Sequence, residues 1–298
     1  MKEAFQRVGL IAKSGDERVI RVLKELAGLL DGLGMEAVLD KRLAEALPNW
    51  QSQISDAEVM AENVDLIIVV GGDGTLLNAA RLLAPRPVPL AGINLGRLGF
   101  LTDMAADRAV EEMTAVLQGR YTRDHRHMLH ARIREGDSVV AEDLALNDVV
   151  IQKADGGRMI EFETWVDDRF VSLHRADGMI AATATGSTAY ALSGGGPILH
   201  PDVDALALVP ICPHTLSDRP LVIPGKSRVH FILRGERSNQ AQINWDGQQT
   251  SPVAPGQTVE LQRSEQTTTL LHPPSYDYFA LLRSKLHWGR SQDGNVPR

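Results

Sequence analysis

The sequence predicts a two-domain protein in which an α/β domain is followed by an all-β domain. In residues 1–120, short apolar runs alternate with segments whose apolar residues recur at helical spacing, as in a parallel sheet covered by helices. From about residue 121 to 274, apolar and polar residues alternate one by one between turn signals, which predicts antiparallel strands. Residues 276–288 regain a helical pattern, and we expect this C-terminal helix to return to the first domain.

The elements of the first domain follow a βαβ order. Asp16 is placed to cap a helix whose apolar face runs over residues 19–33, and Gly34 would end that helix. A further helix is predicted after Asp107, which would cap it, and another begins at Leu76. Short apolar runs predict strands at residues 8–12, 37–39, 66–70 and 88–93. This order is typical of a parallel sheet with helices on its faces.

The second domain is predicted to consist of strands joined by tight turns. Residues 161–166 alternate apolar and polar side chains, Asp167 and Asp168 supply a turn, and the alternation resumes at 169–173. This is the pattern of a β-hairpin. Further short β-type runs occur at residues 139–140, 149–151, 229–233, 242–245 and 259–261.

Composition limits the classes of function. The chain of 298 residues has a formal net charge of −7, so no overall basic field favours nucleic acid. No apolar run is long enough to cross a bilayer, and no signal-peptide core is recognisable. The single cysteine, Cys212, excludes an internal disulfide and fits a reducing compartment; we expect it to be a packing residue. These observations predict a soluble cytoplasmic protein that binds neither nucleic acid nor membranes.

A glycine-rich turn with one carboxylate follows an apolar run of the buried-strand type. Gly71, Gly72, Asp73, Gly74 and Thr75 stand between this strand and a predicted helix. Glycines let backbone N–H groups approach an anion, and the helix N-terminus adds positive potential. A simple capping turn would have the same pattern, but the acid at its tip favours a phosphate-binding loop with Asp73 as general base. The GxxxxGK[ST] pattern is absent, so the sequence predicts a kinase without a P-loop.

Two polar residues interrupt an apolar run at residues 144–151. Asn147 and Asp148 need partners there, because a buried polar group without a hydrogen bond destabilises the fold. A bulge or turn could pair them with the backbone. Alternatively, they hold the hydroxyl groups of a ribose, which offer a donor and an acceptor together. The residues alone leave both interpretations open.

A dense run of small and hydroxyl residues extends from Asp177 to Ser193. Small side chains let a planar ring or phosphates approach, and Ser and Thr donate hydrogen bonds without bulk; a tight interdomain turn would have the same composition. Tyr190 could cover an adenine, although a core position is the simpler interpretation. Arg175 beside Asp177 could form a surface ion pair or clamp a phosphate.

Together these motifs resemble the NAD kinase family, and its bacterial branch most closely. The resemblance spans about residues 7–285, and its motifs lie at residues 71–75, 92–101, 146–150, 159–162, 175–178, 185–190 and 213–220. Diacylglycerol-type lipid kinases and phosphofructokinases share the glycine–aspartate loop. The hydroxyl-rich run together with the Asn–Asp pair is far more specific.

The resemblance implies a fold, a reaction and partners. Residues 1–120 would form a Rossmann-like domain completed by 275–298, and residues 121–274 a β-sandwich-like domain that binds NAD and mediates oligomerisation. The enzyme would transfer the γ-phosphate of ATP, with a divalent metal such as Mg²⁺, to the 2′-hydroxyl of the adenosine ribose of NAD. The products would be NADP and ADP, and the protein would be a homodimer or homotetramer.

The resemblance also implies roles for individual residues. Asp73 would deprotonate the 2′-hydroxyl, Asn147 and Asp148 would hold the ribose, and Arg175 and Asp177 would face the nicotinamide half or a neighbouring subunit. No side chain is expected to be a metal ligand. The implied phosphate loop comprises Gly71, Gly72, Gly74 and Thr75. The implied NAD-binding residues are Asp73, Gly74, Asn147, Asp148, Arg158, Arg175, Asp177, Thr188, Ala189, Tyr190, Ala191, Leu192, Ser193 and Gln248.

Two alternatives stand beside this interpretation. A lipid or small-alcohol kinase could use the same glycine loop, but it would need an apolar acyl groove, which the polar residues 183–193 disfavour. A non-catalytic NAD(H) sensor would bind the dinucleotide without any need for Asp73.

Overall fold

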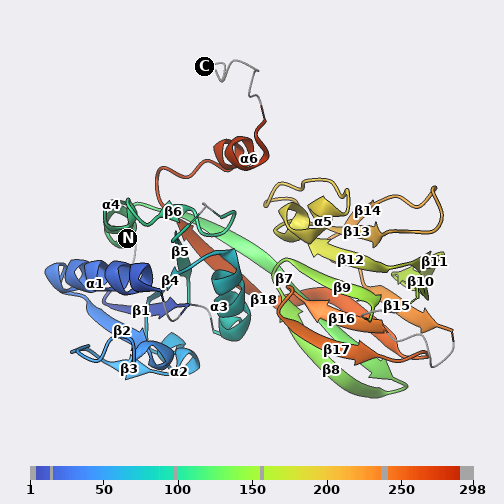
Figure 1. Ribbon diagram of the computed structural model, residues 1–298, viewed down its shortest axis with the longest axis horizontal. Helices are drawn as coiled ribbons and strands as arrows, with labels where there is room; N and C mark the ends of the chain where they lie inside the picture. The colour runs from blue at the N-terminus through green and yellow to red at the C-terminus, as the bar shows by residue number, and fades with distance from the viewer. Residues whose placement is uncertain are drawn as a thin grey trace. The chain divides into compact units, whose positions relative to one another are not determined.

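The chain divides into two compact units (Figure 1). The computed structural model describes residues 5–13, 16–86, 88–96, 99–154, 158–235 and 241–288. Unit 1 takes its residues from 1–76, 88–124 and 269–298, and unit 2 takes its residues from 77–87 and 125–268. Unit 1 is α/β and contains the C-terminal helix, whereas unit 2 is largely β, so the predicted fold class is confirmed. The part of the predicted C-terminal segment beyond residue 288 lies outside the described residues, as do residues 97–98 of the 92–101 motif.

Unit 1 is built on a parallel sheet. Its strands run in the order β18-β5-β4-β1-β2-β3, with β6 beside β5, and the pairs along this order are parallel. β4 and β5 are buried along their whole length, which explains their continuous apolar sequences. The strands are β1 (Arg7–Ala12), β2 (Glu36–Asp40), β3 (Ile54–Ser55), β4 (Leu66–Val70), β5 (Leu90–Asn94), β6 (Met104–Ala105) and the end of β18 (Thr258–His272).

The helices of unit 1 begin and end close to where the sequence predicts. The Asp16 carboxylate caps α1 by accepting a hydrogen bond from the Arg18 N–H at 2.9 Å, and Gly34 follows the helix at a φ of 69°. The predicted cap at Asp107 is wrong, because α4 begins one residue later, after Arg108, and no side chain caps it. The helices are α1 (Glu17–Gly32), η1 (Lys41–Leu43), α2 (Ala57–Ala61), α4 (Ala109–Leu117), α6 (Tyr278–Leu286) and the first turn of α3 (Asp73–Leu83), whose residues from Leu77 onward belong to unit 2.

Apolar side chains pack on both faces of this sheet. On one face, Leu10 and Ile68 pack with α1 and with Met113 of α4 in a buried cluster. Adjacent residues of a strand point to opposite faces, so Gly9 faces the other side. There, Met60 of α2 lies so close that a Cβ at position 9 would overlap its sulfur. Helices thus cover both faces, as a parallel sheet requires.

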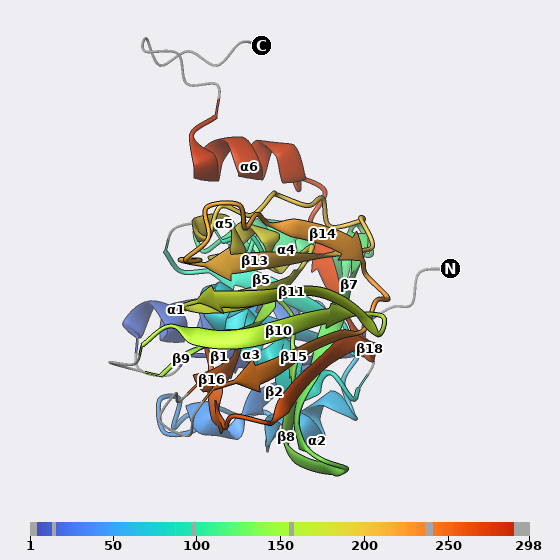
Figure 2. The ribbon, with the colours of Figure 1, turned by 90° about the vertical axis from the view of Figure 1, so that its right-hand side faces the viewer.

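Unit 2 consists of two antiparallel sheets. In the first, the order β11-β10-β15-β18 continues to β7 and β8; in the second, the order is β14-β13-β12-β9-β16-β17. Figure 2 shows β10 beside β11 and β13 beside β14. The remaining strands are β7 (Thr122–Glu135), β8 (Ser138–Ala145), β9 (Asp148–Lys153), β10 (Ile160–Val166), β11 (Arg169–Ala176), β12 (Gly178–Thr183), β13 (Ala205–Ile211), β14 (Leu221–Pro224), β15 (Val229–Arg234), β16 (Ala241–Trp245) and β17 (Gln249–Val253).

The core of unit 2 joins residues of both sheets. Phe162 and Phe231 from the first sheet share a buried cluster with Ile151 and Trp245 from the second. The two phenylalanine rings meet edge to face, with their centroids 5.9 Å apart, a favourable geometry for aromatic pairs. Two sheets that share a core in this way form a β-sandwich. A short helix, α5 (Tyr190–Ser193), adds Ala191 to a smaller buried cluster with residues of β9, β12 and β13.

The predicted hairpin turn is confirmed. Asp167 and Asp168 both have positive φ values, 50° and 64°, as a two-residue turn between twisted strands requires. The Asp167 carboxylate accepts hydrogen bonds from the Ser227 hydroxyl at 3.0 Å and from the Arg228 N–H at 2.9 Å. These bonds hold a non-glycine residue in a conformation that glycine would adopt more easily.

The apolar run 144–151 contains a bend at residues 146–147, between β8 and β9, which agrees with the bulge-or-turn alternative for its backbone. By contrast, the expectation for Cys212 is wrong. Cys212 is exposed at a φ of 45°, after the end of β13, and so is not a packing residue. β12 was not expected as a strand, since its small residues carry no strong β signal. Among the described helices, none has the length and apolarity needed to span a membrane.

Candidate functional site

A pocket of about 550 Å³ lies in unit 1, where several parallel strands end. In open α/β sheets, ligands bind beyond the carboxyl ends of the strands. The pocket combines a glycine turn, two carboxylates and two lysines. Its lining residues are Lys13, Asp16, Val19, Gly71, Gly72, Asp73, Asn94, Leu95, Gly96, Gly99 and Lys285.

The predicted glycine turn is part of this pocket. α3 begins at Asp73, three residues before the expected Leu76, because the N–H groups of Thr75 and Leu76 already bond to the Gly72 carbonyl. The Gly71 N–H donates to the carbonyl of Ile93 in β5 at 2.8 Å. Gly71 and Gly72 therefore line the pocket between the end of β4 and the start of α3. Gly74 and Thr75 belong to the first turn of α3.

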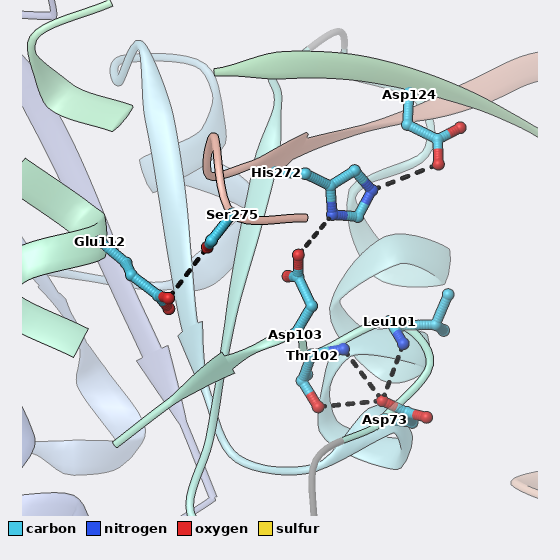
Figure 3. Close-up of polar contacts among 8 residues, drawn as sticks. All are labelled: Asp73, Leu101, Thr102, Asp103, Glu112, Asp124, His272 and Ser275. Atoms are coloured by element: carbon cyan, nitrogen blue, oxygen red, sulfur yellow. Dashed lines mark hydrogen bonds and ion pairs between the residues drawn. The ribbon is translucent and has the colours of Figure 1, made fainter. Parts of the chain in front are cut away.

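The Asp73 carboxylate is held by a loop that follows β5 (Figure 3). Oδ1 accepts hydrogen bonds from the Leu101 N–H at 3.1 Å, the Thr102 N–H at 3.0 Å and the Thr102 hydroxyl at 2.9 Å. Oδ2 accepts a hydrogen bond from the Phe100 N–H at 2.8 Å. Among the described residues, Oδ1 is thus the anchored oxygen, and Oδ2 keeps acceptor capacity for a ligand.

Buried polar groups fix this loop in turn. The Asn94 amide donates to the Thr102 hydroxyl at 2.7 Å and accepts from the Gly96 N–H at 2.7 Å. Thr102 is fully buried and Asn94 is nearly so. Gly99 must be glycine, since a Cβ there would overlap Asp73 Oδ1. Asp73 therefore sits in a preorganised cradle of donors.

Two lysines bring positive charge to the pocket. Lys13 follows β1, and its N–H bonds to the Val70 carbonyl at 3.4 Å. Lys285 comes from α6, with Nζ 5.8 Å from the centre of the Phe100 ring. Asp16 at the start of α1 remains acidic, because hydrogen bonds from Arg18 lower its pKa. Cations beside a glycine turn suit a polyphosphate ligand.

In unit 2, the structure answers the question that Asn147 and Asp148 raised. The Asp246 carboxylate accepts the N–H groups of Leu146 and Asn147 at 2.8 Å each and that of Asp148 at 3.1 Å. The backbone is thus paired, as a bend requires, while the Asn147 and Asp148 side chains form no hydrogen bond with any residue that the structure describes. No role was expected for Asp246 from the sequence motifs, although the Asp246–Gly247 turn after β16 was a detectable signal.

Two carboxyl groups lie close together at this bend. Burial, reinforced by the charge of Asp246, raises the pKa of Asp148 to about 7. Burial also raises the pKa of Asp246, although the three backbone hydrogen bonds and the charge of Arg81 oppose the rise. Arg81 is held nearby, since its guanidinium lies 3.7 Å from Asp143 and donates to the Trp245 carbonyl at 3.4 Å. Asp148 is therefore half-protonated near neutral pH.

This carboxyl group makes stability depend on pH. Between the ordinary value of 3.8 and about 7, the folded state holds a proton that the unfolded state has lost, so the free energy of unfolding falls as pH rises through this range. In Asp148→Asn the side chain is neutral at every pH. The free energy of unfolding of this variant is expected to exceed that of the parent by up to ~4 kcal/mol at about pH 8 and to differ little from it at about pH 4.5. Urea unfolding at both pH values measures this difference, and a difference independent of pH would contradict the prediction.

The structure brings Asn147 together with part of the hydroxyl-rich run. The Asn147 carbonyl accepts the Thr183 N–H at 2.9 Å, and the Thr183 hydroxyl accepts the Gly186 N–H at 3.1 Å. A Cβ at Gly186 would overlap the Asn147 carbonyl, so this contact needs glycine. The bend at 146–148 and the segment 183–188 therefore form one hydrogen-bonded assembly.

Further along the run, residues 186–188 form η2 (Gly186–Thr188) and residues 190–193 form α5. The Thr188 hydroxyl donates to the Thr185 carbonyl at 3.3 Å, and the Ala189 N–H donates to the Gly186 carbonyl at 2.9 Å. Tyr190 is 44% exposed, so its simpler interpretation as a core residue is wrong. Ala191 is buried, Leu192 is half-buried and Ser193 is exposed.

The other predicted residues of unit 2 have separate surroundings. The Asp177 carboxylate pairs with Lys153 Nζ at 2.9 Å. Arg175 is exposed on β11, and its carbonyl accepts the His214 N–H at 2.9 Å. Arg158 is exposed, and the Gln248 N–H donates to the Trp245 carbonyl at 2.9 Å in the turn that carries Asp246.

Family models match most of the chain. The ATP-NAD kinase N-terminal domain matches residues 8–121, and the ATP-NAD kinase C-terminal domain matches residues 146–272. The NAD kinase of Pseudomonas putida strain W619 is 42% identical over 292 residues, 98% of this chain and 99% of the relative. The NAD kinase of Ectopseudomonas mendocina is also 42% identical, over 293 residues, 98% of this chain and 99% of the relative.

Solved structures show the same likeness. An NAD kinase from Archaeoglobus fulgidus in complex with ATP is 27% identical, with a TM-score of 0.74, over 95% of this chain and 99% of that one. Yeast NADH kinase complexed with NADH shares the fold, with a TM-score of 0.87 at 22% identity, over 100% of this chain and 91% of that one. The motifs, the family models and the near full-length relatives agree, and the chain belongs to the ATP-NAD kinase family.

Proposed function

We propose that the protein transfers the γ-phosphate of ATP to the 2′-hydroxyl of the adenosine ribose of NAD, giving NADP and ADP. The observation that carries this proposal is the glycine turn of unit 1, where Asp73 is held by four hydrogen bonds in a pocket that two lysines also line. Membership of the ATP-NAD kinase family and the near full-length relatives named NAD kinase support the choice of substrates.

Asp73 is the proposed general base. Oδ1 is anchored by three donors, whereas Oδ2 accepts one hydrogen bond among the described residues. Oδ2 is therefore the oxygen that accepts the hydroxyl proton, while the loop prevents the carboxylate from rotating. Phosphoryl transfer asks the protein mainly for positioning and for stabilisation of charge. A fixed carboxylate supplies the first of these requirements.

Lys13, Lys285 and the glycine turn are proposed to bind the phosphates of ATP. Lysine ammonium groups and backbone N–H groups stabilise negative charge that spreads over the phosphoryl oxygens. Neither lysine could be found from the sequence, because each is an isolated residue in an element far along the chain from the glycine turn. The pocket brings them together.

The donor set fits a Mg²⁺ ion that is carried mainly by the nucleotide. Among the described residues, no group of three or more His, Cys, Asp or Glu side chains could hold a metal, and Mg²⁺ in kinases uses one or two carboxylates plus substrate phosphates. The phosphates of ATP would hold the ion, since Asp73 Oδ2 is assigned to the hydroxyl proton and both oxygens of Asp16 accept hydrogen bonds from Arg18. When bound, Mg²⁺ would neutralise phosphate charge.

The predicted NAD-binding residues of unit 2 are proposed to bind the dinucleotide. Among the described residues, the Asn147 and Asp148 side chains form no hydrogen bond, while their N–H groups are held by Asp246. These side chains and the exposed Tyr190 beside small residues support the assignment. Arg158, Arg175, Asp177 and Gln248 are assigned to the same ligand or to a neighbouring subunit. We also propose that the chain works in the cytoplasm as a homodimer or homotetramer formed through its β domain.

A coupled assay tests the function. Purified protein is incubated with ATP, Mg²⁺ and NAD, and NADP is measured with an NADP-specific dehydrogenase; a parallel reaction offers diacylglycerol. NADP formation without lipid phosphorylation is the expected result. Phosphorylation of diacylglycerol alone would support the lipid-kinase alternative, and NAD binding without NADP formation would support the sensor.

The lysines of the pocket provide a further prediction. Lys13→Ala and Lys285→Ala are each expected to raise the KM for ATP about 3–10-fold and to leave the KM for NAD within about two-fold, since a solvated cation contributes ~1 kcal/mol to phosphate binding. The effect is expected to shrink at high salt. Lys24→Ala is the control, because Lys24 is exposed on α1 and does not line the pocket. A rise of equal size in all three variants would contradict the assignment.

A further inference from the structure

A buried histidine lies between two carboxylates in unit 1 (Figure 3). His272, the last residue of β18, has 1% of its side chain exposed. Its Nδ1 lies 3.0 Å from Asp103 Oδ2, and its Nε2 lies 3.2 Å from Asp124 Oδ2. The Tyr276 ring stacks on the imidazole at 3.9 Å, with 10° between the planes. Neither the sequence motifs nor the proposed function uses this histidine.

The geometry determines the charge of the imidazole. A neutral histidine has one N–H group and can donate to only one of two carboxylates, whereas an imidazolium donates to both. Burial lowers the pKa of His272, but the hydrogen bonds and charges of Asp103 and Asp124 outweigh it and raise the pKa above the ordinary value. Glu112 of α4 faces the same cluster, and burial together with the nearby Asp103 charge raises its pKa.

Asp103 connects this cluster to the candidate catalytic carboxylate. It directly follows Thr102, whose N–H and hydroxyl both donate to Asp73 Oδ1. Among the described residues, His272 is the donor to the Asp103 side chain, since the other oxygen, Oδ1, is buried without a hydrogen-bond partner. The loop that holds Asp73 is therefore attached to β18 through one hydrogen bond from an imidazole.

We propose that His272 is a positioning residue for Asp73, acting through Asp103 on the loop formed by residues 99–103. The histidine touches no substrate in this proposal. It fixes the loop donors, and these donors fix the direction in which Asp73 Oδ2 points. The inference rests on the proposed kinase function, because it assigns a kinetic consequence to this loop.

The surrounding chain offers a matched control. Residues 272–276 have a second attachment, to α4, where the Ser275 hydroxyl donates to Glu112 at 3.0 Å. Arg108 also pairs with Glu112 at 3.1 Å. Ser275→Ala removes this second attachment but leaves His272, Asp103 and the loop in place. If the C-terminal segment had only a structural role, loss of either attachment would change kcat to a similar extent.

The experiment compares His272→Gln, Asp103→Asn, Asp124→Asn and Ser275→Ala in the coupled assay. His272→Gln and Asp103→Asn are expected to lower kcat at least about 10-fold and to leave both KM values within about three-fold, since the loss is in the positioning of a catalytic group. Ser275→Ala is expected to keep kcat within about two-fold. Circular dichroism confirms that each variant is folded.

The pH profile separates positioning from stability. In the parent, kcat is expected to fall on an alkaline limb as His272 loses its proton. Asp124→Asn keeps the bond to Asp103 but removes one carboxylate, so this limb should move about one unit to lower pH. His272→Gln should lack the limb. A limb at the same pH in all variants would overturn the proposal.

The outcomes distinguish this inference from the proposed function. No NADP from the parent would overturn the function and this inference with it. NADP from the parent, with kcat unchanged in folded His272→Gln and Asp103→Asn, would overturn the inference alone. If the variants fail to fold, nitrogen NMR of the parent still tests the proposal. Both ring nitrogens of His272 should carry protons at neutral pH. A neutral imidazole would overturn the proposal.

Discussion

Asp73→Asn is expected to lower NADP formation by about 10²–10⁴-fold, to below detection in the coupled assay, because it removes the general base. NAD affinity should stay within a few-fold, since the substitution keeps the size of the side chain. The amide also introduces a local conflict. Its NH₂ group must face one of the N–H donors of residues 100–102 that now bond to the carboxylate.

Two measurements make this result specific. Isothermal titration with NAD separates loss of turnover from loss of binding, and Asp31→Asn, an exposed change on α1, provides a control that should keep full activity. Turnover within two-fold of the parent in a folded Asp73→Asn variant would exclude Asp73 as the base. The sensor alternative would then regain support, because a sensor does not need this carboxylate.

Asp246→Ala is expected to destabilise unit 2 by about 3–5 kcal/mol, because it leaves the N–H groups of residues 146–148 without their acceptor. These three groups now bond to one carboxylate at 2.8, 2.8 and 3.1 Å. Loss of the charge beside Asp148 offsets part of this cost, since it lowers the repulsion between two buried carboxyl groups. NAD binding should weaken with the bend. Urea unfolding and NAD titration measure the two effects.

The control for this prediction is another aspartate of unit 2. Asp202 has 84% of its side chain exposed, so Asp202→Ala should change stability by less than about 0.5 kcal/mol. If Asp246→Ala unfolded at the same urea concentration as Asp202→Ala, the three hydrogen bonds would contribute nothing to the bend.

Local features of the molecule could be predicted from the sequence. The pocket turn around Asp73 was predictable because a strand, glycines, an acid and a helix follow one another directly. The hairpin turn at Asp167 and Asp168 and the end of α1 at Gly34 were predictable for the same reason. In each case, one backbone conformation restricts which residues are acceptable.

Long-range pairings could not be predicted in this way. Asp246 accepts N–H groups from residues about one hundred positions earlier, and His272 meets Asp103 across 169 positions. Nothing in the local pattern of an Asp-Gly turn or of a strand end indicates its distant partner. A bend was one of two alternatives for the Asn147–Asp148 pair, but its acceptor, Asp246, could not be found from the neighbouring residues. Likewise, α4 begins one residue later than a cap at Asp107 would place it, and no side chain caps it.

The strand order of unit 1 has a consequence for biosynthesis. β5 pairs with β4 on one side and with the end of β18 on the other, where Leu90 meets Leu270. A ribosome therefore makes β5 long before its second neighbour exists. Before residue 270 emerges, β6 can pair with Ile93 and Asn94 of β5, but the hydrogen-bonding groups nearer Leu90 on that side remain available to other chains. Nascent chains should therefore need protection of this short edge until β18 is made.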